Sequence, residues 1–333
     1  MRTCWRASEA TAWFLAALAG AGLALALSSC GGFDHLTRVQ SSIPLSKDCA
    51  ACHVDIAREW TASPHAAAWS SADFRAASNG YRFSACLPCH APEPAWSSRT
   101  PSVARAGGRQ EGVTCVSCHL EPATAESPAA MAGPLPPTGM VSPHPVTVRP
   151  ERYRDAAFCG RCHEGTYRQW RQAAQADKPP CQQCHMPAIR RKMTQSTGGI
   201  SGLLVAMEKA EMERRHTFDP LPRSLEAPPV ALSARRQDEQ IEMVLHNRLP
   251  HAIPTGEFGF RVCVLRVGDE SGPLAQQELS AHGGTALPAG GELRWRLDRR
   301  DPGAWPARLR VRLAKLHPDG RASEWFVLEV PVP

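Results

Sequence analysis

The stretch CAACHVDIAREWTASPHAAA, residues 49–68, contains the pattern that decides how this chain folds. A Cys-x-x-Cys pair is followed directly by His53, and a second histidine, His65, comes twelve residues later. Residues 54–62 favour a helix, which must end before Pro64 because proline disfavours a helical conformation in the residue before it. At 1.5 Å per residue, such a helix separates the two histidines by about 15 Å. His53 and His65 therefore cannot bind the same metal ion.

The Cys-x-x-Cys-His pattern occurs five times in the chain. Its cysteines are Cys49, Cys52, Cys86, Cys89, Cys115, Cys118, Cys159, Cys162, Cys181 and Cys184. The histidines that follow them are His53, His90, His119, His163 and His185. Because the 333 residues include only 13 histidines, a chance coincidence at all five pairs is excluded.

This pattern is the attachment signature of haem c. The two thiols bind the vinyl groups on one edge of the porphyrin, and the adjacent histidine binds the iron as its proximal ligand. Zinc sites commonly combine cysteine pairs two by two, and a disulfide framework gives no reason for the histidines. The sequence therefore predicts five covalently bound haem c groups.

All five motifs lie between residues 49 and 185, too short a segment to build an ordinary core around five porphyrins. We expect the porphyrins themselves to form the core, wrapped by short helices and long loops, and to lie close enough to exchange electrons. Their propionates offset the formal net charge of +6. No block of Lys and Arg indicates nucleic-acid binding.

The second axial ligands decide between electron transfer and catalysis, because an iron with two histidines is closed to substrates. The candidate distal ligands are His65, His144, His216 and His251. Alternatives are a capping or exposed role for His65 and a plain linker role for His144. We expect the remaining histidines at the surface; they are His35, His246, His282 and His317.

An internal repeat bears on these ligands. The pattern CH-x₆-W occurs at His53–Trp60 and again at His163–Trp170. Aligning the two tryptophans places Gln175 opposite His65. A strict duplicate would have a histidine at position 175 that ligates one haem. That haem must therefore take its distal ligand from elsewhere or remain five-coordinate.

The N-terminus predicts export. Residues 1–29 combine a basic start with an uncharged apolar run at 12–27, shorter than the roughly 20 residues that a transmembrane helix needs. The run ends in LSSC, which resembles a bacterial lipoprotein signal, so we predict lipidation at Cys30; the alternative is an ordinary cleaved signal. By the same resemblance, the absence of an acidic residue at position 31 implies delivery to the outer rather than the inner membrane. The predicted location is the periplasm or outer membrane, with a lipid anchor at Cys30.

The domain prediction follows the motifs. A linker is expected at 30–44, a pentahaem domain at 45–200, a connecting helix at 201–216 and a β-sandwich at 226–333. In the last region six to seven alternating stretches, such as QIEMVLHN and ARLRVRLAKL, predict short strands. Cys263 is expected to be a buried hydrophobic residue. The fold class is thus a mostly α and loop multihaem domain followed by a small all-β, sandwich-like domain.

These residues resemble a known family. The chain resembles the tetrahaem cytochromes that accept electrons from hydroxylamine oxidoreductase in the stretches CAACHVDIAREWTASPHA, CLPCH, GVTCVSCH and FCGRCH. It resembles larger multihaem relatives of that family in the stretches CQQCHMP, RRHTF and NRLPHAIPTGEFGFR. The resemblance covers about residues 45–260. It implies parallel and perpendicular haem pairs, His65 and His144 as ligands of haems other than their own, and one five-coordinate haem. The fifth haem, the lipoprotein signal and the C-terminal extension depart from that family.

The leading functional hypothesis is electron transfer by an exported pentahaem lipoprotein, with no catalytic residue. Its partners would be other redox proteins, namely donor and acceptor cytochromes or a quinol-linked complex, and the membrane through the lipid anchor. A second hypothesis is a multihaem reductase acting on a small nitrogen or sulfur oxyanion, or on nitric oxide, at a five-coordinate haem. A third is a haem-stabilised scaffold for a respiratory complex.

Overall fold

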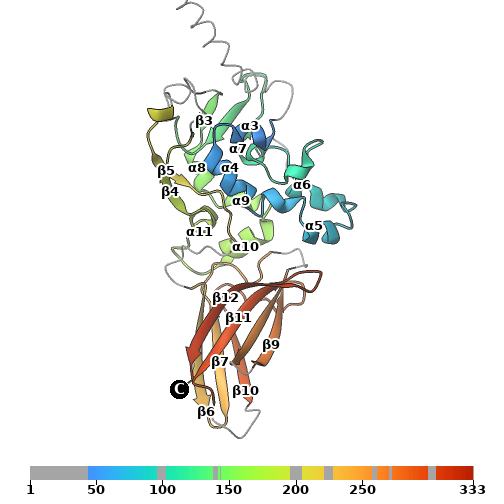
Figure 1. Cartoon of the computed structure of the whole chain (residues 1–333), viewed down its shortest axis with the longest axis vertical. Coiled ribbons are helices and arrows are strands. Elements are labelled where there is room, and N and C mark those ends of the chain that lie inside the picture. Colours follow the sequence, from blue (N-terminus) through green and yellow to red (C-terminus); the bar gives the residue numbers. More distant parts are fainter. Residues whose placement is uncertain are drawn as a thin grey trace, which may run out of the picture.

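The computed structural model describes residues 44–95, 103–137, 142, 144–195, 205–220, 228–256, 261–269, 272–298 and 305–332. The predicted signal peptide, Cys30, His35 and all but the last residue of the predicted linker lie outside the described residues. Within these ranges, every helix falls short of the length and hydrophobicity required to cross a bilayer. Figure 1 shows two regions along the long axis, a helical region above an all-β region.

The helical region, residues 44–220, contains short helices joined by long loops. These are α3 (Ser46–Ala50), α4 (Val54–Thr61), α5 (Ala72–Ala77), α6 (Leu87–His90), α7 (Cys115–His119), α8 (Pro150–Arg154), α9 (Ala157–Gly160), α10 (Glu164–Gln172) and α11 (Cys181–His185). Three 3₁₀ turns accompany them, η2 (Ala66–Ala68), η3 (Ser84–Cys86) and η4 (Arg109–Glu111). Helix α4 confirms the helix predicted after the first motif.

The Cys-x-x-Cys-His motifs adopt helical turns. The amide of His53 donates to the carbonyl of Cys49 at 2.9 Å, and that of His163 donates to Cys159 at 3.0 Å. A helical turn places residues i, i+3 and i+4 on the same face. Both thiols and the imidazole of a motif therefore face the same way.

Two small sheets complete the helical region. One consists of β1 (Leu120–Glu121), β2 (Ala130–Gly133) and β3 (Val146–Val148), and the other pairs β4 (Ala188–Arg191) with β5 (Glu211–Arg214). The prediction of a helix at 201–216 is wrong for residues 211–214, which form strand β5. Its residues have good helix propensity, but backbone pairing with β4 and inward packing of Glu213 against Arg191 override this weak preference.

The C-terminal region confirms the all-β prediction. Its strands are β6 (Val230–Gln237), β7 (Gln240–Asn247), β8 (Val262–Asp269), β9 (Gly272–Ser280), β10 (Glu292–Asp298), β11 (Arg308–Leu316) and β12 (Ala322–Pro331). They form two antiparallel sheets, in the orders β10-β7-β6 and β12-β11-β8-β9. Strand β9 was missed by the sequence patterns. Alternate residues of β7 and β11, such as Met243 and Val311, meet in one shared core, which also contains Cys263.

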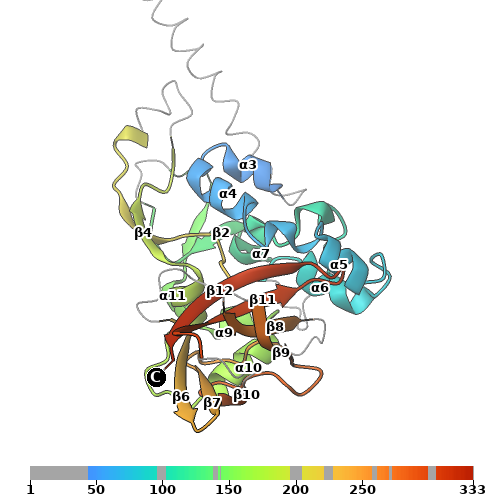
Figure 2. The ribbon, with the colours of Figure 1, turned by 60° about the horizontal axis from the view of Figure 1, so that its bottom comes forward.

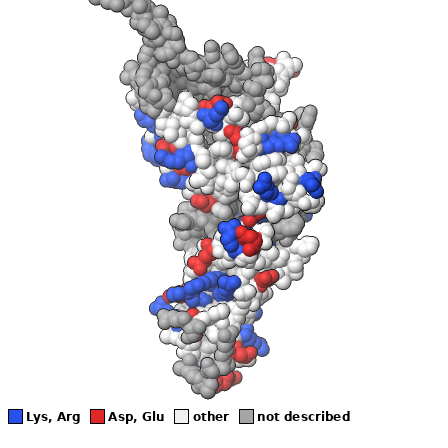
Figure 3. Space-filling model, turned by 45° about the vertical axis from the view of Figure 1, so that its right-hand side comes forward, with Lys and Arg blue, Asp and Glu red and all other residues white. Residues whose placement is uncertain are grey.

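Surface charges of both signs are interspersed on the face in Figure 3. On β11, the exposed Arg308 and Arg310 lie 3.5 and 2.8 Å from Glu329 of β12, and Arg312 lies 3.9 Å from Glu324. This arginine row is thus a solvated strand face paired with carboxylates of the neighbouring strand.

Candidate functional site

Four histidines from outside the motifs each face a motif histidine. The ring centroids are 6.4 Å apart for His53 and His144, 6.2 Å for His119 and His216, 6.1 Å for His65 and His163, and 6.4 Å for His185 and His251. Every pair joins segments that are distant in sequence. The helix α4 carries His65 away from His53, so His65 meets the histidine of the fourth motif.

These distances match two imidazoles on opposite sides of one ion. An imidazole nitrogen binds a metal at about 2.0 Å, and adding the distance from each nitrogen to its ring centre places the two centroids roughly 6 Å apart. Among the described residues no group of three or more His, Cys, Asp or Glu side chains is arranged to hold a metal ion. Paired histidines without further side-chain ligands suit an iron whose other ligands come from a porphyrin.

Four of the motif histidines are oriented by backbone carbonyls. Nδ1 lies 2.9 Å from Met193 O in His53, 2.6 Å from Ala68 O in His90, 2.7 Å from Ala132 O in His119 and 2.7 Å from Asp219 O in His185. A hydrogen bond of this kind places the ring proton on Nδ1 and leaves the Nε2 lone pair available to a metal. The rings are therefore held in the tautomer that an iron ligand needs.

Burial lowers the pKa of two of the histidines that face motif histidines, His65 and His216. Desolvation, followed by the charge of His163, lowers the pKa of His65 to about 3. Desolvation and His119 likewise lower the pKa of His216 to about 3. Neutral rings at physiological pH are the form that binds iron.

The helical region lacks a side-chain core of its own. Among its described residues only six hydrophobic residues are buried, and three of them are alanines, Ala91, Ala132 and Ala156. The ten motif cysteines form no disulfide with one another, and all are only partly buried. An interior lined by thiols and imidazoles but poor in large apolar side chains fits porphyrins as the missing core.

The sulfur atoms also show which motifs are neighbours. Cys49 interacts directly with Cys115 of the third motif, and Cys159 of the fourth motif does so with Cys181 of the fifth. Cys89 of the second motif contacts Cys162 of the fourth. The fourth motif therefore lies at the centre of the attachment sites, and Cys118 of the third motif also lies within electrostatic range of Cys159.

The CH-x₆-W repeat corresponds to a repeated structure. Trp60 of α4 donates its indole N–H to Val113 O at 2.8 Å, two residues before the third motif. Trp170 of α10 donates to Pro179 O at 2.9 Å, two residues before the fifth motif. The first and third motifs thus form one unit, and the fourth and fifth form its counterpart.

Gln175 has a different role from its aligned residue His65. Its amide nitrogen lies 3.2 Å from Arg248 O and 3.5 Å from Leu249 O, in the loop of the β-region that carries His251. Gln175 stands where a duplicated histidine would lie, and it anchors the loop that brings His251 to His185.

Two positioning residues escaped the sequence patterns. Glu59 of α4 accepts from the backbone amide of His216 at 2.9 Å and from Arg191 and Arg215, both at 3.0 Å. Asn247 is fully buried, and its Nδ2 donates to His251 O at 2.9 Å. Neither residue belongs to a motif, so only the tertiary contacts identify them.

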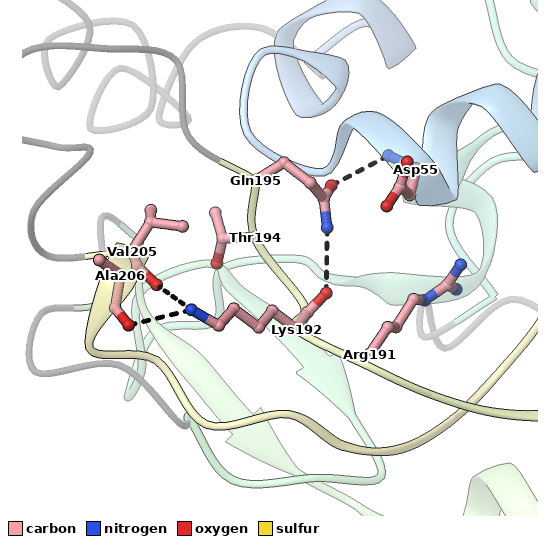
Figure 4. A pocket seen from close by; sticks show the side chains of 7 residues that line it. All are labelled: Asp55, Arg191, Lys192, Thr194, Gln195, Val205 and Ala206. Atoms are coloured by element: carbon pink, nitrogen blue, oxygen red, sulfur yellow. Dashed lines mark hydrogen bonds between the residues drawn. The ribbon is translucent and has the colours of Figure 1, made fainter.

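A pocket of about 390 Å³ lies beside α4 and the end of β4 (Figure 4). Its polar groups are paired with one another. Gln195 accepts from the amide of Asp55 at 2.9 Å and donates to Lys192 O at 3.0 Å, while Lys192 Nζ donates to Ala206 O at 2.9 Å. These bonds hold the 192–195 segment, which supplies Met193 O to His53. The pocket wall is therefore a support for that histidine.

His90 differs from the other motif histidines. No described histidine faces its ring. Instead, Phe74 stacks on it at a centroid distance of 3.6 Å and an interplanar angle of 6°. Burial lowers the pKa of His90, although the hydrogen bond to Ala68 O acts in the opposite direction.

Comparisons with known proteins agree with this geometry. The sequence model of the family "Cytochrome c554 and c-prime" matches residues 48–120. No curated protein matches the chain. A solved structure of a penta-heme cytochrome c552 from Thermochromatium tepidum is 19% identical, with a TM-score of 0.55 over 86% of this chain and 99% of that one.

Two other solved structures overlap with smaller parts of the chain. An oxidised superoxide reductase is 13% identical over 31% of this chain and 86% of its own, with a TM-score of 0.19. Catalytically inactive OgpA from Akkermansia muciniphila is 12% identical over 35% of this chain and 33% of its own, with a TM-score of 0.19. Similarity at this level carries no argument.

The class of the protein follows from the paired histidines, the family match and the shared fold. The chain has the fold of a multihaem c-type cytochrome. Haem c is the cofactor that this family match and this fold support.

Proposed function

We propose that the chain is an electron carrier with five covalently attached haem c groups, one at each Cys-x-x-Cys-His motif. The observation that carries this proposal is the set of four histidine pairs spaced for one metal ion each. In it, His144, His216, His65 and His251 are the distal ligands opposite His53, His119, His163 and His185. The penta-heme description of the cytochrome c552 with a similar fold supports the count of five.

When bound, haem c supplies a reversible one-electron centre, and adjacent centres exchange electrons. The chain determines the order of these centres through its attachment sites. Sulfur contacts connect the first motif to the third, the fourth to the fifth, and the second to the fourth, and Cys118 of the third motif lies within electrostatic range of Cys159 of the fourth. The order of sites is thus a line from the first motif to the fifth, with the second as a branch at the fourth.

Electron paramagnetic resonance and pyridine haemochrome spectra of the purified holoprotein test this function. We expect five haems per chain, four of them low-spin with two histidine ligands. Fewer than four low-spin bis-histidine centres, or a haem count below five, would overturn the proposed ligand set.

A reductase is the second candidate, and the observation that favours it is that no histidine among the described residues faces His90. A sixth position free of a protein ligand would admit a small nitrogen or sulfur oxyanion, or nitric oxide. The expected signature is a high-spin signal that responds to nitrite or nitric oxide. A protein that only carries electrons would reduce neither nitrite nor nitric oxide.

We further propose that the protein is exported and lipid-anchored at Cys30 in the periplasm or at the outer membrane, within the wider superfamily of the hydroxylamine-oxidoreductase partners. Its donors and acceptors would be other cytochromes or a quinol-linked complex. A Cys30→Ala variant should move from the membrane fraction to the soluble periplasmic fraction. A variant that stays in the membrane fraction would exclude the anchor.

A further inference from the structure

Helix α5 joins the haem site of His90 to the β-region. The ring of Phe74 packs against the ring of His90, and Phe74 itself is only 6% exposed. The carbonyl of Ala68, just before α5, accepts from His90 Nδ1 at 2.6 Å. The segment 68–74 therefore contacts the imidazole on its face and at its nitrogen.

The residue before Phe74 is bound by the β-region. Lys315 Nζ donates to Asp73 Oδ2 at 2.6 Å, and His317 Nδ1 lies 2.9 Å from the same oxygen. His317 was expected at the surface, yet its side chain is only 16% exposed, and its Nε2 lies 2.7 Å from Ser323 Oγ. Lys315, His317 and Ser323 lie at or next to the β11–β12 turn, which Figures 1 and 2 place beside α5.

The electrostatics indicate a specific attachment rather than an incidental surface contact. Burial raises the pKa of Asp73, but hydrogen bonds from Lys315 and His317 outweigh this effect and leave the pKa below its ordinary value. A carboxylate that accepts from two basic side chains is held in a defined position. Because Asp73 and Phe74 are consecutive in one helical turn, a displacement of the first moves the second.

We propose that Asp73, Lys315 and His317 are positioning residues for the haem at Cys86 and Cys89, through which the β-region sets the orientation of His90. This inference rests on the proposed haem at that motif. The orientation of a ligand ring and its hydrogen bond tune the metal that it binds. Because the ring of His90 is held by Phe74 and Ala68 O, a haem bound at this motif would take up an external ligand more slowly than one whose proximal histidine is free to move.

An Asp73→Ala holoprotein variant tests the inference. We expect a shifted resonance signal and a several-fold faster carbon monoxide association at one ferrous haem, with the bis-histidine signals unchanged. A His90→Met variant identifies the affected haem, because it changes the ligand of that iron alone. The charge exchange Asp73→Lys with Lys315→Asp should restore the native signal. Glu329→Ala is the matched control, since Glu329 is a carboxylate of the β-region that pairs with the exposed Arg308 and Arg310.

Three results would overturn the inference. One is an Asp73→Ala protein with native spectra and native carbon monoxide kinetics but lower thermal stability, which would make the contact purely structural. Another is an equal shift at all haems. The third is a Phe74→Leu variant without effect on the His90 haem, because Phe74 is the link. Loss of the five-haem count in the unsubstituted protein would instead refute the proposed function, so the two failures are distinguishable.

Discussion

The helical and the β-region fill their interiors in different ways. Within the described residues, the β-region buries seventeen hydrophobic residues, whereas the longer helical region buries six. The two sheets pack Leu, Ile, Met and Val between them, so their own side chains supply the burial that stabilises them. The helical region instead presents sulfurs and imidazoles inward. We therefore expect the β-region to fold on its own side chains and the helical region to need haem attachment.

The two regions meet where ligands are positioned. The loop around His251 belongs to the β-region, yet its ring faces His185, and Gln175 and Gln169 of the helical region bind its backbone. The β11–β12 turn holds α5 beside His90. The β-region therefore contacts the helical region close to two motif histidines, His185 and His90.

The largest expected effect comes from producing the chain without haem attachment. Residues 44–220 should then lose protection in hydrogen exchange, because no side-chain core remains to hold them, while strands β6 to β12 stay protected. Hydrogen exchange with mass spectrometry, against the holoprotein as control, measures this. Strong protection of the helical region without haem would break the comparison between the regions.

A core truncation in the β-region should have the next largest effect. Leu245 is 1% exposed, and a Leu245→Ala variant should lower the free energy of unfolding of the β-region by about 2–5 kcal/mol. Denaturant titration of the holoprotein measures the change, with Val327→Ala, 39% exposed, as a near-neutral control. A uniform change in all haem spectra at native conditions would show that the β-region is not an independent unit.

A ligand substitution should affect one haem. In a His65→Ala variant, the haem at His163 should change from low-spin to high-spin, because its distal imidazole is removed. Resonance spectra and a redox titration measure the change, with the exposed His246→Ala as control. If every haem stayed low-spin and unshifted, the assignment of His65 would be wrong.

The smallest effect is expected at the contact between the regions. Gln175→Ala removes two hydrogen bonds to the His251 loop and should cost about 1 kcal/mol in stability. It should also slightly shift the potential of the haem at His185. Gln240→Ala, which removes a bond to the exposed Asp298 far from this contact, is the control. Identical potentials in both variants would mean that Gln175 does not position His251.

Local sequence patterns predicted the helices and strands whose own residues indicate their conformation. Helix α4 follows from its composition and Pro64, and β7 follows from strict alternation of Ile241, Met243 and Leu245. Strand β9, GPLAQQELS, lacks β-branched residues and was missed because pairing with β8 defines it. Strand β5 was mistaken for a helix because only its pairing with β4 reveals its conformation.

The sequence by itself determined the covalent chemistry of this protein. Cys-x-x-Cys-His is a local signature, because one helical turn is enough to place two thiols and an imidazole together. The partners of those imidazoles were decided by the tertiary structure alone. The pairing of His65 with His163, the replacement of a duplicated histidine by the Gln175 contact, and the link from Asp73 to the β-region all join residues distant in sequence. Such contacts leave no periodic pattern in the chain, because they depend on how the elements pack.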